Sequence, residues 1–138
     1  HFYFEFQEYF SNNFENLLPR DRFDHDRVEM IKKLDRHKIL PLLPGLLEWT
    51  QDMNWPVAKS VVELLLTFPE EIVPHVQDVL SSNDDNWKYF VLHALVRNLP
   101  IESRVQFRAY LTRVSEAPTR NERAEGLDEI AKDILEKI

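Results

Sequence analysis

Apolar residues recur at helical spacing near the end of the chain, in a stripe formed by Leu127, Ile130, Ala131, Ile134, Leu135 and Ile138. Intervals of three and four residues place such side chains on one face of an α-helix. Thr119 followed by Glu122 matches a capping box, so we expect this last helix to begin just after Pro118. The helix predicted before it carries Phe107, Tyr110, Leu111 and Val114.

The middle of the chain contains an internal repeat. The block Asp-Met-Asn-Trp at 52–55 returns as Asp-Asp-Asn-Trp at 84–87, 32 residues later. Each block follows an Ile-x-Pro triplet and precedes a long apolar stretch that ends in proline, at Pro69 and Pro100. Each unit therefore predicts two helices joined by a short turn. The helices cover about 40–51 and 55–68 in the first unit, and about 71–82 and 86–99 in the second.

A two-helix period in the low thirties, without strands, is typical of helical solenoids. We therefore predict an all-α fold of tandem helical hairpins, a HEAT-like, α-solenoid-type repeat domain of about seven to eight helices. The second helix of each unit is apolar around most of its circumference, so it is expected to line the inner core. The predicted single domain, 1–138, has an aromatic segment at 1–17, repeats at 39–69 and 72–100, and a cap at 101–138. A further flanking helix is expected near 24–38.

Aromatic residues are concentrated at the start of the chain, at Phe2, Tyr3, Phe4, Phe6, Tyr9, Phe10 and Phe14. The first few residues fit both a helical stripe and the alternation of a strand. We favour a helix over about 5–17 that ends before Pro19, because a residue before proline avoids the α region. The chain begins with His1 rather than methionine, from which we expect a fragment of a longer chain.

Several blocks resemble a known family. They are LLPRDRFD at 17–24, LLEWTQDMNWPVA at 46–58 and DNWKY at 85–89, with PTRNE at 118–122 and EG at 125–126. These blocks look like the domain of unknown function 5071 family, which is uncharacterised and mainly bacterial. The resemblance covers about residues 17–138. It implies a compact helical-repeat domain and no particular activity, because the family has none assigned.

Charge is distributed unevenly along a chain whose net charge is −7. Residues 44–86 contain a single base, Lys59, against the acids Glu48, Asp52, Glu63, Glu70, Glu71, Asp78, Asp84 and Asp85. Arginines outnumber glutamates between Arg97 and Arg123. Both regions are explained either by solvated faces or by surfaces that attract partners of opposite charge.

Composition narrows the classes of partner and the location. A net negative charge argues against nucleic acid, since affinity for it comes mainly from neutralising phosphates. No apolar run approaches the roughly 20 residues of a membrane span, so no membrane partner is expected. The absence of cysteine fits a reducing compartment, and we expect a cytoplasmic protein. The basic cluster at 32–38 ends a predicted helix, where cations complement the helix dipole; the alternative is an anion site.

The two Asp-x-Asn-Trp blocks have a structural and a functional interpretation. In the structural one, an acid or amide caps each second helix, and Trp55 and Trp87 wedge between neighbouring hairpins. In the functional one, the blocks form an acidic, tryptophan-rich ridge that binds a partner. Trp49, at the edge of its helix, is either an interface anchor or packs against a neighbouring segment. The candidate partner-binding residues are Glu48, Trp49, Asp52, Asn54, Trp55, Glu70, Glu71, Asp84, Asp85 and Trp87.

Motifs for catalysis are missing from the sequence. The histidines form no i, i+4 pair with a carboxylate, and no serine lies in a nucleophile elbow. We therefore expect no catalytic residue, no metal and no cofactor. The leading hypothesis is a non-enzymatic protein-binding module, such as an immunity or adaptor-type protein, for a basic partner. The alternatives are an enzyme with an acidic groove between repeats, and a structural or oligomerising domain that uses the aromatic N-terminus. The oligomeric state stays open.

Overall fold

A computed structural model describes residues 17–138, and every regular element within that range is helical, with no strand. The predicted all-α class is therefore confirmed. Eight helices in this range have five residues or more, and two further helical turns have four. The helix expected over 5–17 lies outside the described residues, apart from Leu17.

The first half of the described chain begins with α2 (His25–Lys32), α3 (Arg36–Ile39) and the 3-10 turn η1 (Leu40–Leu42). It continues with α4 (Leu43–Leu47), η2 (Glu48–Thr50) and α5 (Ala58–Leu65). Pro41 and Pro44 lie in the first turns of η1 and α4, where a missing N–H costs little. The predicted helix near 24–38 is two helices, because the chain leaves α2 at Lys33. Lys32 and Lys33 end α2, as predicted for the basic cluster, whereas Arg36, His37 and Lys38 belong to the separate four-residue helix α3.

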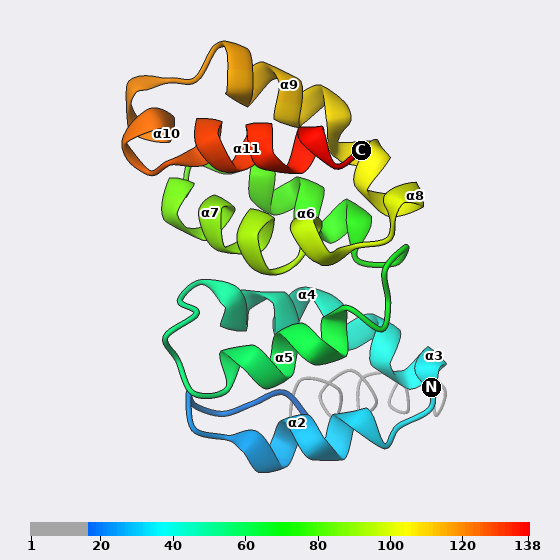
Figure 1. Ribbon diagram of the computed structural model, residues 1–138. Helices are drawn as coiled ribbons and strands as arrows, with labels where there is room; N and C mark the ends of the chain where they lie inside the picture. The colour runs from blue at the N-terminus through cyan, green and yellow to red at the C-terminus, as the bar shows by residue number, and fades with distance from the viewer. Residues whose placement is uncertain (1–16) are drawn as a thin grey trace, which may run out of the picture.

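The second half contains α6 (Val73–Leu80), α7 (Asp85–Ala94), η3 (Val96–Asn98), α8 (Ile101–Arg104) and η4 (Val105–Phe107). It ends with α9 (Arg108–Glu116), α10 (Arg120–Ala124) and α11 (Leu127–Glu136). Figure 1 shows these helices in pairs, with α4 beside α5, then α6 beside α7, then α9 beside α11. Helix α2 lies at the opposite end of the molecule from α9.

Both helices of each hairpin contribute to one hydrophobic core. Val61 and Leu65 in α5 and Val57 just before it are fully buried, as expected. Leu46 in α4 and Val76 in α6 are also fully buried, so the first helices are not the more exposed members of the pairs. A helix that packs between two layers buries residues on both sides, whichever position it has in its hairpin.

The C-terminal stripe is confirmed as the buried face of α11, but the helix starts later than the capping box suggested. Thr119 and Glu122 cap the short helix α10, each side chain accepting a backbone N–H of the other residue. Gly126 then adopts a left-handed conformation, with φ of 77°, which ends α10 and turns the chain into α11. The single helix predicted from Pro118 onward is therefore two helices.

Glu122 combines the capping box with an ion pair. Arg113 in α9 donates to both of its carboxylate oxygens, over 2.6 and 2.8 Å. The Glu122 side chain is 4% exposed, whereas that of Arg113 is 47% exposed. The hydrogen bonds from Arg113 lower the pKa of Glu122 to about 2 against the opposing effect of burial. This carboxylate therefore joins α9 to α10.

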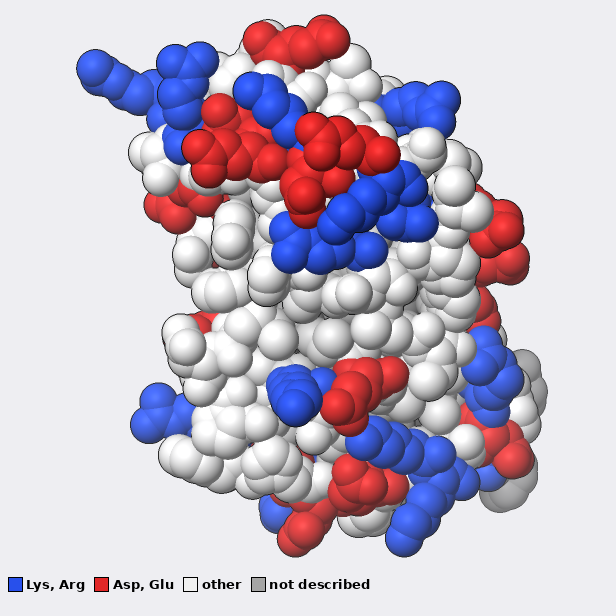
Figure 2. Space-filling model, in the orientation of Figure 1, with Lys and Arg blue, Asp and Glu red and all other residues white. Residues whose placement is uncertain are grey.

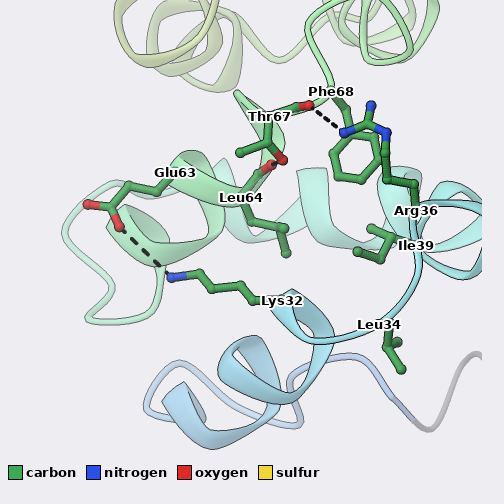
Figure 3. Close-up of a pocket in the computed structure, with 8 residues that line it drawn as sticks. All are labelled: Lys32, Leu34, Arg36, Ile39, Glu63, Leu64, Thr67 and Phe68. Carbon is green, nitrogen blue, oxygen red and sulfur yellow. Dashed lines mark hydrogen bonds and ion pairs between the residues drawn. The ribbon is translucent and has the colours of Figure 1, made fainter.

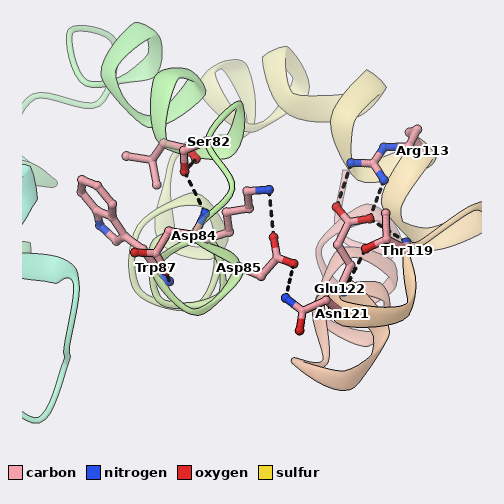
Figure 4. A network of polar contacts seen from close by, with 10 residues as sticks. Ser82, Asp84, Asp85, Trp87, Arg113, Thr119, Asn121 and Glu122 are labelled. Atoms are coloured by element: carbon pink, nitrogen blue, oxygen red, sulfur yellow. Dashed lines mark hydrogen bonds and ion pairs between the residues drawn. The ribbon is translucent and has the colours of Figure 1, made fainter.

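A second polar contact joins α7 to α10 (Figure 4). Lys88 and Asp85 form an ion pair of 2.9 Å with side chains that are only 8% and 10% exposed. The amide of Asn121 donates to the other oxygen of Asp85 over 2.6 Å. Both oxygens of Asp85 are thus engaged inside the protein, which compensates the cost of burying the charge.

We expect Glu122→Gln to lower the free energy of unfolding by about 2 kcal/mol at neutral pH, because glutamine preserves the capping box but loses the ion pair. The full pKa shift is discounted because Arg113 is half exposed to solvent. The folded pKa of Glu122 lies below its ordinary value of 4.5. Its contribution is therefore present above that value and is lost as the pH falls toward about 2.

Urea unfolding of both proteins at several pH values between about 7 and 2.5 measures this effect. The difference in free energy between wild type and variant should shrink as the pH falls. A difference that stayed constant over this range would show that the ion pair contributes nothing.

Candidate protein-binding surface

The structure gathers most of the predicted partner-binding residues at one end of the helix pairs. Residues 48–57 lead into the N-terminus of α5, and residues 66–72 leave its C-terminus, so Glu70 and Glu71 lie at the other end. In Figure 1 the α4–α5 connection is on the side of the molecule where α7 begins. The first Asp-x-Asn-Trp block therefore lies near the second, as the repeat suggested.

A first pocket, the Trp49 pocket, has a volume of about 350 Å³ and is lined by Leu18, Pro19, Gly45, Glu48, Trp49, Gln51 and Trp55. The rings of Trp49 and Trp55 meet edge to face with centroids 5.5 Å apart. Trp49 also packs against the hydrophobic core. Gly45 lets Leu18 approach closely, because a Cβ at this position would lie 2.5 Å from Leu18 Cδ1.

Asp52 and Asn54 shape the loop beside this pocket. The backbone N–H of Asn54 donates to the Asp52 carboxylate over 2.8 Å, which is an Asx turn. Helix α5 begins later, at Ala58, without a side-chain cap. The predicted capping role of the first block is therefore wrong, because two residues separate Trp55 from Ala58 and the loop uses Asp52 for its own turn.

A second pocket, the Trp87 pocket, has a volume of about 200 Å³ and is lined by Pro44, Leu47, Glu48, His75, Asp78, Val79, Ser82 and Trp87. Glu48 lines both pockets, so the two hollows adjoin. Sequence reasoning did not select His75, Asp78 or Ser82 for the site. Their spacing along α6 and just beyond it does place them on one face, but only the docking of α6 against α4 brings that face to Glu48.

Trp87 also connects the two hairpins. Its indole N–H donates to the Thr50 hydroxyl over 2.9 Å, and that hydroxyl donates to the Leu47 carbonyl over 2.6 Å. Thr50 is fully buried. Figure 4 shows the Trp87 indole extending away from Arg113 and Glu122, toward the first hairpin. The predicted wedge between neighbouring hairpins is confirmed for Trp87, whereas Trp55 packs on Trp49 of its own hairpin.

Asp84 and Asp85 have different roles although they are adjacent. Asp84 is exposed and caps α7, since its carboxylate accepts the Trp87 backbone N–H over 3.0 Å. Asp85 is directed inward, to Lys88 and Asn121. The capping role predicted for the second block is confirmed at Asp84. A partner at this surface would meet the carboxylate of Asp84, because that of Asp85 is already engaged.

The acids around the two pockets form no ion pair with another described residue. Ion pairs within residues 17–138 involve the carboxylates of Asp24, Glu29, Glu63, Glu71, Asp85, Glu122 and Asp133. That group does not include Glu48, Asp52, Asp78 or Asp84. These four carboxylates therefore leave a negative charge that no ion pair within the described residues compensates.

The largest of these pockets, about 410 Å³, lies elsewhere, between α2, α3 and α5 (Figure 3). Its walls are mainly apolar, and Lys32 and Arg36 lie at its edge. Arg36 donates to Glu71 over 2.8 Å and to the Thr67 carbonyl over 3.0 Å, with its guanidinium 4.1 Å from the Phe68 ring centre. Lys32 pairs with Glu29 and Glu63. Both cations are thus neutralised by acids of the same protein.

Two further classes of site can be tested on the described residues. No group of three or more histidine, aspartate or glutamate side chains within 17–138 is placed to hold a metal ion. No helix in this range has both the length and the apolar character needed to cross a membrane.

The fold and these pockets define an all-helical protein with an acidic, tryptophan-lined end. The family model described as a domain of unknown function, DUF5071, matches residues 17–135. The chain therefore belongs to the DUF5071 family, in agreement with the sequence blocks that resemble it. No curated protein matches the chain.

We expect Trp87→Phe and Thr50→Val to be coupled, because the hydrogen bond between these side chains crosses between the hairpins. A double-mutant cycle on the free energy of unfolding should give a coupling energy of about 0.5–1.5 kcal/mol. Thr67→Val is the matched control, since the Thr67 hydroxyl makes the same kind of bond to a carbonyl three residues earlier. Coupling of Trp87→Phe to Thr67→Val as large as that to Thr50→Val would contradict the assignment.

Trp49→Ala should destabilise the protein more than Trp55→Ala. Trp49 packs against the core, and removing a half-buried tryptophan there should cost about 2–3 kcal/mol, less than the cost at a fully buried site. Trp55 meets Trp49 edge to face and should cost about 1 kcal/mol. Thermal and denaturant melts of the two variants provide the comparison, and the reverse order would show that Trp55 is the inner residue.

Proposed function

We propose that this protein is a non-enzymatic protein-binding module of the immunity or adaptor type that binds a basic partner. The contact is made by an acidic–aromatic surface, which comprises Glu48, Trp49, Asp52, Trp55, Asp78, Asp84 and Trp87. The observation that carries the proposal is the coincidence of uncompensated carboxylates with half-buried tryptophans around two adjoining pockets.

Uncompensated charge supports the choice of a basic partner. Acids of one sign grouped at one end of a molecule produce a field that accelerates the approach of a positive surface. The face seen in Figure 2 has no such grouping of acids. Acidic and basic side chains are interleaved there, above and below a central band of mostly uncharged residues. Interleaved charges largely cancel one another, whereas the negative charges of Glu48, Asp52, Asp78 and Asp84 add up.

The three tryptophans support a protein as the partner. Binding energy in protein interfaces is concentrated in a few aromatic and arginine residues near the centre of the contact. Trp49, Trp55 and Trp87 are each partly exposed, and each lines one of the two pockets. An aromatic ring held in place by its neighbours loses little conformational freedom on binding, which favours affinity.

The scaffold we infer is a single HEAT-like repeat domain over residues 1–138, in a cytoplasmic protein. The sequence repeat of blocks 52–55 and 84–87 and the pairing of α4 with α5 and of α6 with α7 support this architecture. Repeat scaffolds bind through surfaces in which equivalent positions of successive units are aligned. Trp55 and Trp87 are such equivalent positions.

An acidic active site would require a carboxyl with a perturbed pKa in a pocket. The described carboxyls with clearly shifted pKa values are Asp24 and Glu122, and hydrogen bonds from Arg20 and Arg113 lower them. Neither residue lines a pocket described above. These shifts reflect structural ion pairs, which favours the binding role over the enzymatic alternative.

The test uses a surface variant that combines Glu48→Gln, Asp52→Asn, Asp78→Asn and Asp84→Asn. Asparagine preserves both the Asx turn of Asp52 and the helix cap of Asp84, so the variant should fold. The matched control combines Glu102→Gln, Glu116→Gln, Glu125→Gln and Glu136→Gln. These are four exposed acids outside the surface, and the change in net charge is the same.

Affinity capture with mass spectrometry identifies the partner, and surface plasmon resonance then measures its binding. The wild-type association rate should fall steeply between about 0.05 and 0.5 M salt, because screening shortens the reach of the charges. The surface variant should associate about tenfold more slowly, with the control close to wild type. A flat salt dependence, or a partner whose contact surface is acidic, would refute the proposed function.

A further inference from the structure

The Trp87 pocket has the size of one amino-acid side chain. Its volume is about 200 Å³, whereas pockets for small molecules usually have volumes of about 300–1,000 Å³. Its walls come from three elements, with Leu47 in α4, Val79 in α6 and Trp87 in α7. These elements pack on one another through the core, so the core packing forms the pocket in the free protein.

The chemistry of the lining selects a long cationic side chain. Leu47 and Val79 are buried and provide an apolar wall, and Trp87 adds an aromatic one. Glu48 and Asp78 are exposed acids that reach the same hollow from two different helices. None of the described residues that line it is a lysine or an arginine. An apolar stem with a positive tip matches this arrangement, because the stem covers the apolar wall while the tip meets the carboxylates.

Arginine matches the lining better than lysine. A guanidinium is planar, stacks on aromatic rings and donates to carboxylates from several N–H groups at once. The indole N–H of Trp87 is already donated to Thr50, so Trp87 presents its apolar ring, and not a competing donor, to the pocket. A second carboxylate on the opposite helix allows the guanidinium to be held from two sides.

We propose that the Trp87 pocket receives a single arginine side chain of the basic partner, held between Glu48, Asp78 and the Trp87 indole. This inference rests on the proposed function and deepens it. It identifies the anchor residue of the partner, whereas the rest of the acidic–aromatic surface contributes to the rate of approach.

The test uses short peptides, so it does not require the partner. Acetyl-Gly-Arg-Gly-amide is titrated into ¹⁵N-labelled protein, in parallel with the same peptide carrying lysine or citrulline. Citrulline has nearly the shape of arginine but no charge. The arginine peptide should shift the Trp87 indole N–H signal and the amide signals of Leu47 and Val79 in a saturable way, with a dissociation constant of about 1 mM. The lysine peptide should bind about threefold more weakly, and citrulline should give no saturable shift.

Two variants separate the pocket from its surroundings. Glu48→Gln combined with Asp78→Asn should weaken binding of the arginine peptide about tenfold. Glu102→Gln combined with Glu116→Gln removes the same charge at exposed acids outside the acidic–aromatic surface, and should change binding less than about twofold. Unchanged amide spectra outside the mutated sites verify that both variants fold.

Three outcomes would overturn the inference. They are shifts that do not include Trp87, equal binding of lysine and arginine peptides, and equal effects of the two double variants. Failure here is distinguishable from failure of the proposed function. A basic protein that still binds the acidic–aromatic surface with a steep salt dependence would uphold the proposed function, even if the pocket received no arginine.

Discussion

The hydrogen-bonded chain from the Trp87 indole to the Thr50 hydroxyl and on to the Leu47 carbonyl holds the two hairpins in register. Thr50 is fully buried, and displacing α7 would remove the bond that its hydroxyl accepts from Trp87, leaving the bond to the Leu47 carbonyl in its own hairpin. Hydrophobic packing alone is not directional and would tolerate small shifts of one layer over the other. The same contact fixes the ring that forms one wall of the Trp87 pocket, so stability and the candidate site depend on one interaction.

The start of α7 illustrates how neighbouring residues acquire unlike roles. Asp84 caps the helix from outside, while Asp85 is directed inward to Lys88 and Asn121. Asp84 is the N-cap, with a non-helical backbone, whereas Asp85 is the first residue of the helix, so the two carboxylates face different directions. One is therefore available to a partner, and the other attaches the C-terminal helices to the second hairpin. Glu122 serves the same structural purpose between α9 and α10, through Arg113.

The distribution of ion pairs reflects the same difference between carboxylates that hold helices together and carboxylates that are available to a partner. Arginines match the acids at the α9–α10 junction and between α3 and the segment after α5, and at the α7–α10 junction Asp85 is held by Lys88 and Asn121. Around the two tryptophan-lined pockets the acids are left unmatched. A carboxylate that stabilises the fold gains from a nearby cation, whereas one that attracts a partner must leave its charge uncompensated until binding. The proposed function uses the carboxylates that have no ion pair. Glu71 and Asp85 already have partners within the protein, so they are poorly placed to contribute.

The sequence by itself determined the helical class, the apolar faces, the cap at Asp84 and the membership in the DUF5071 family, because these depend on local spacing and on short motifs. It did not reveal the break at Gly126 or the late start of α5, since both follow from how neighbouring helices dock. Only the tertiary structure decided that Asp78 and His75 meet Glu48 and Trp87 in one pocket, and that Glu70 and Glu71 lie elsewhere. Contacts between residues about 30 positions apart are fixed by packing of the whole core, which no local pattern in the chain encodes.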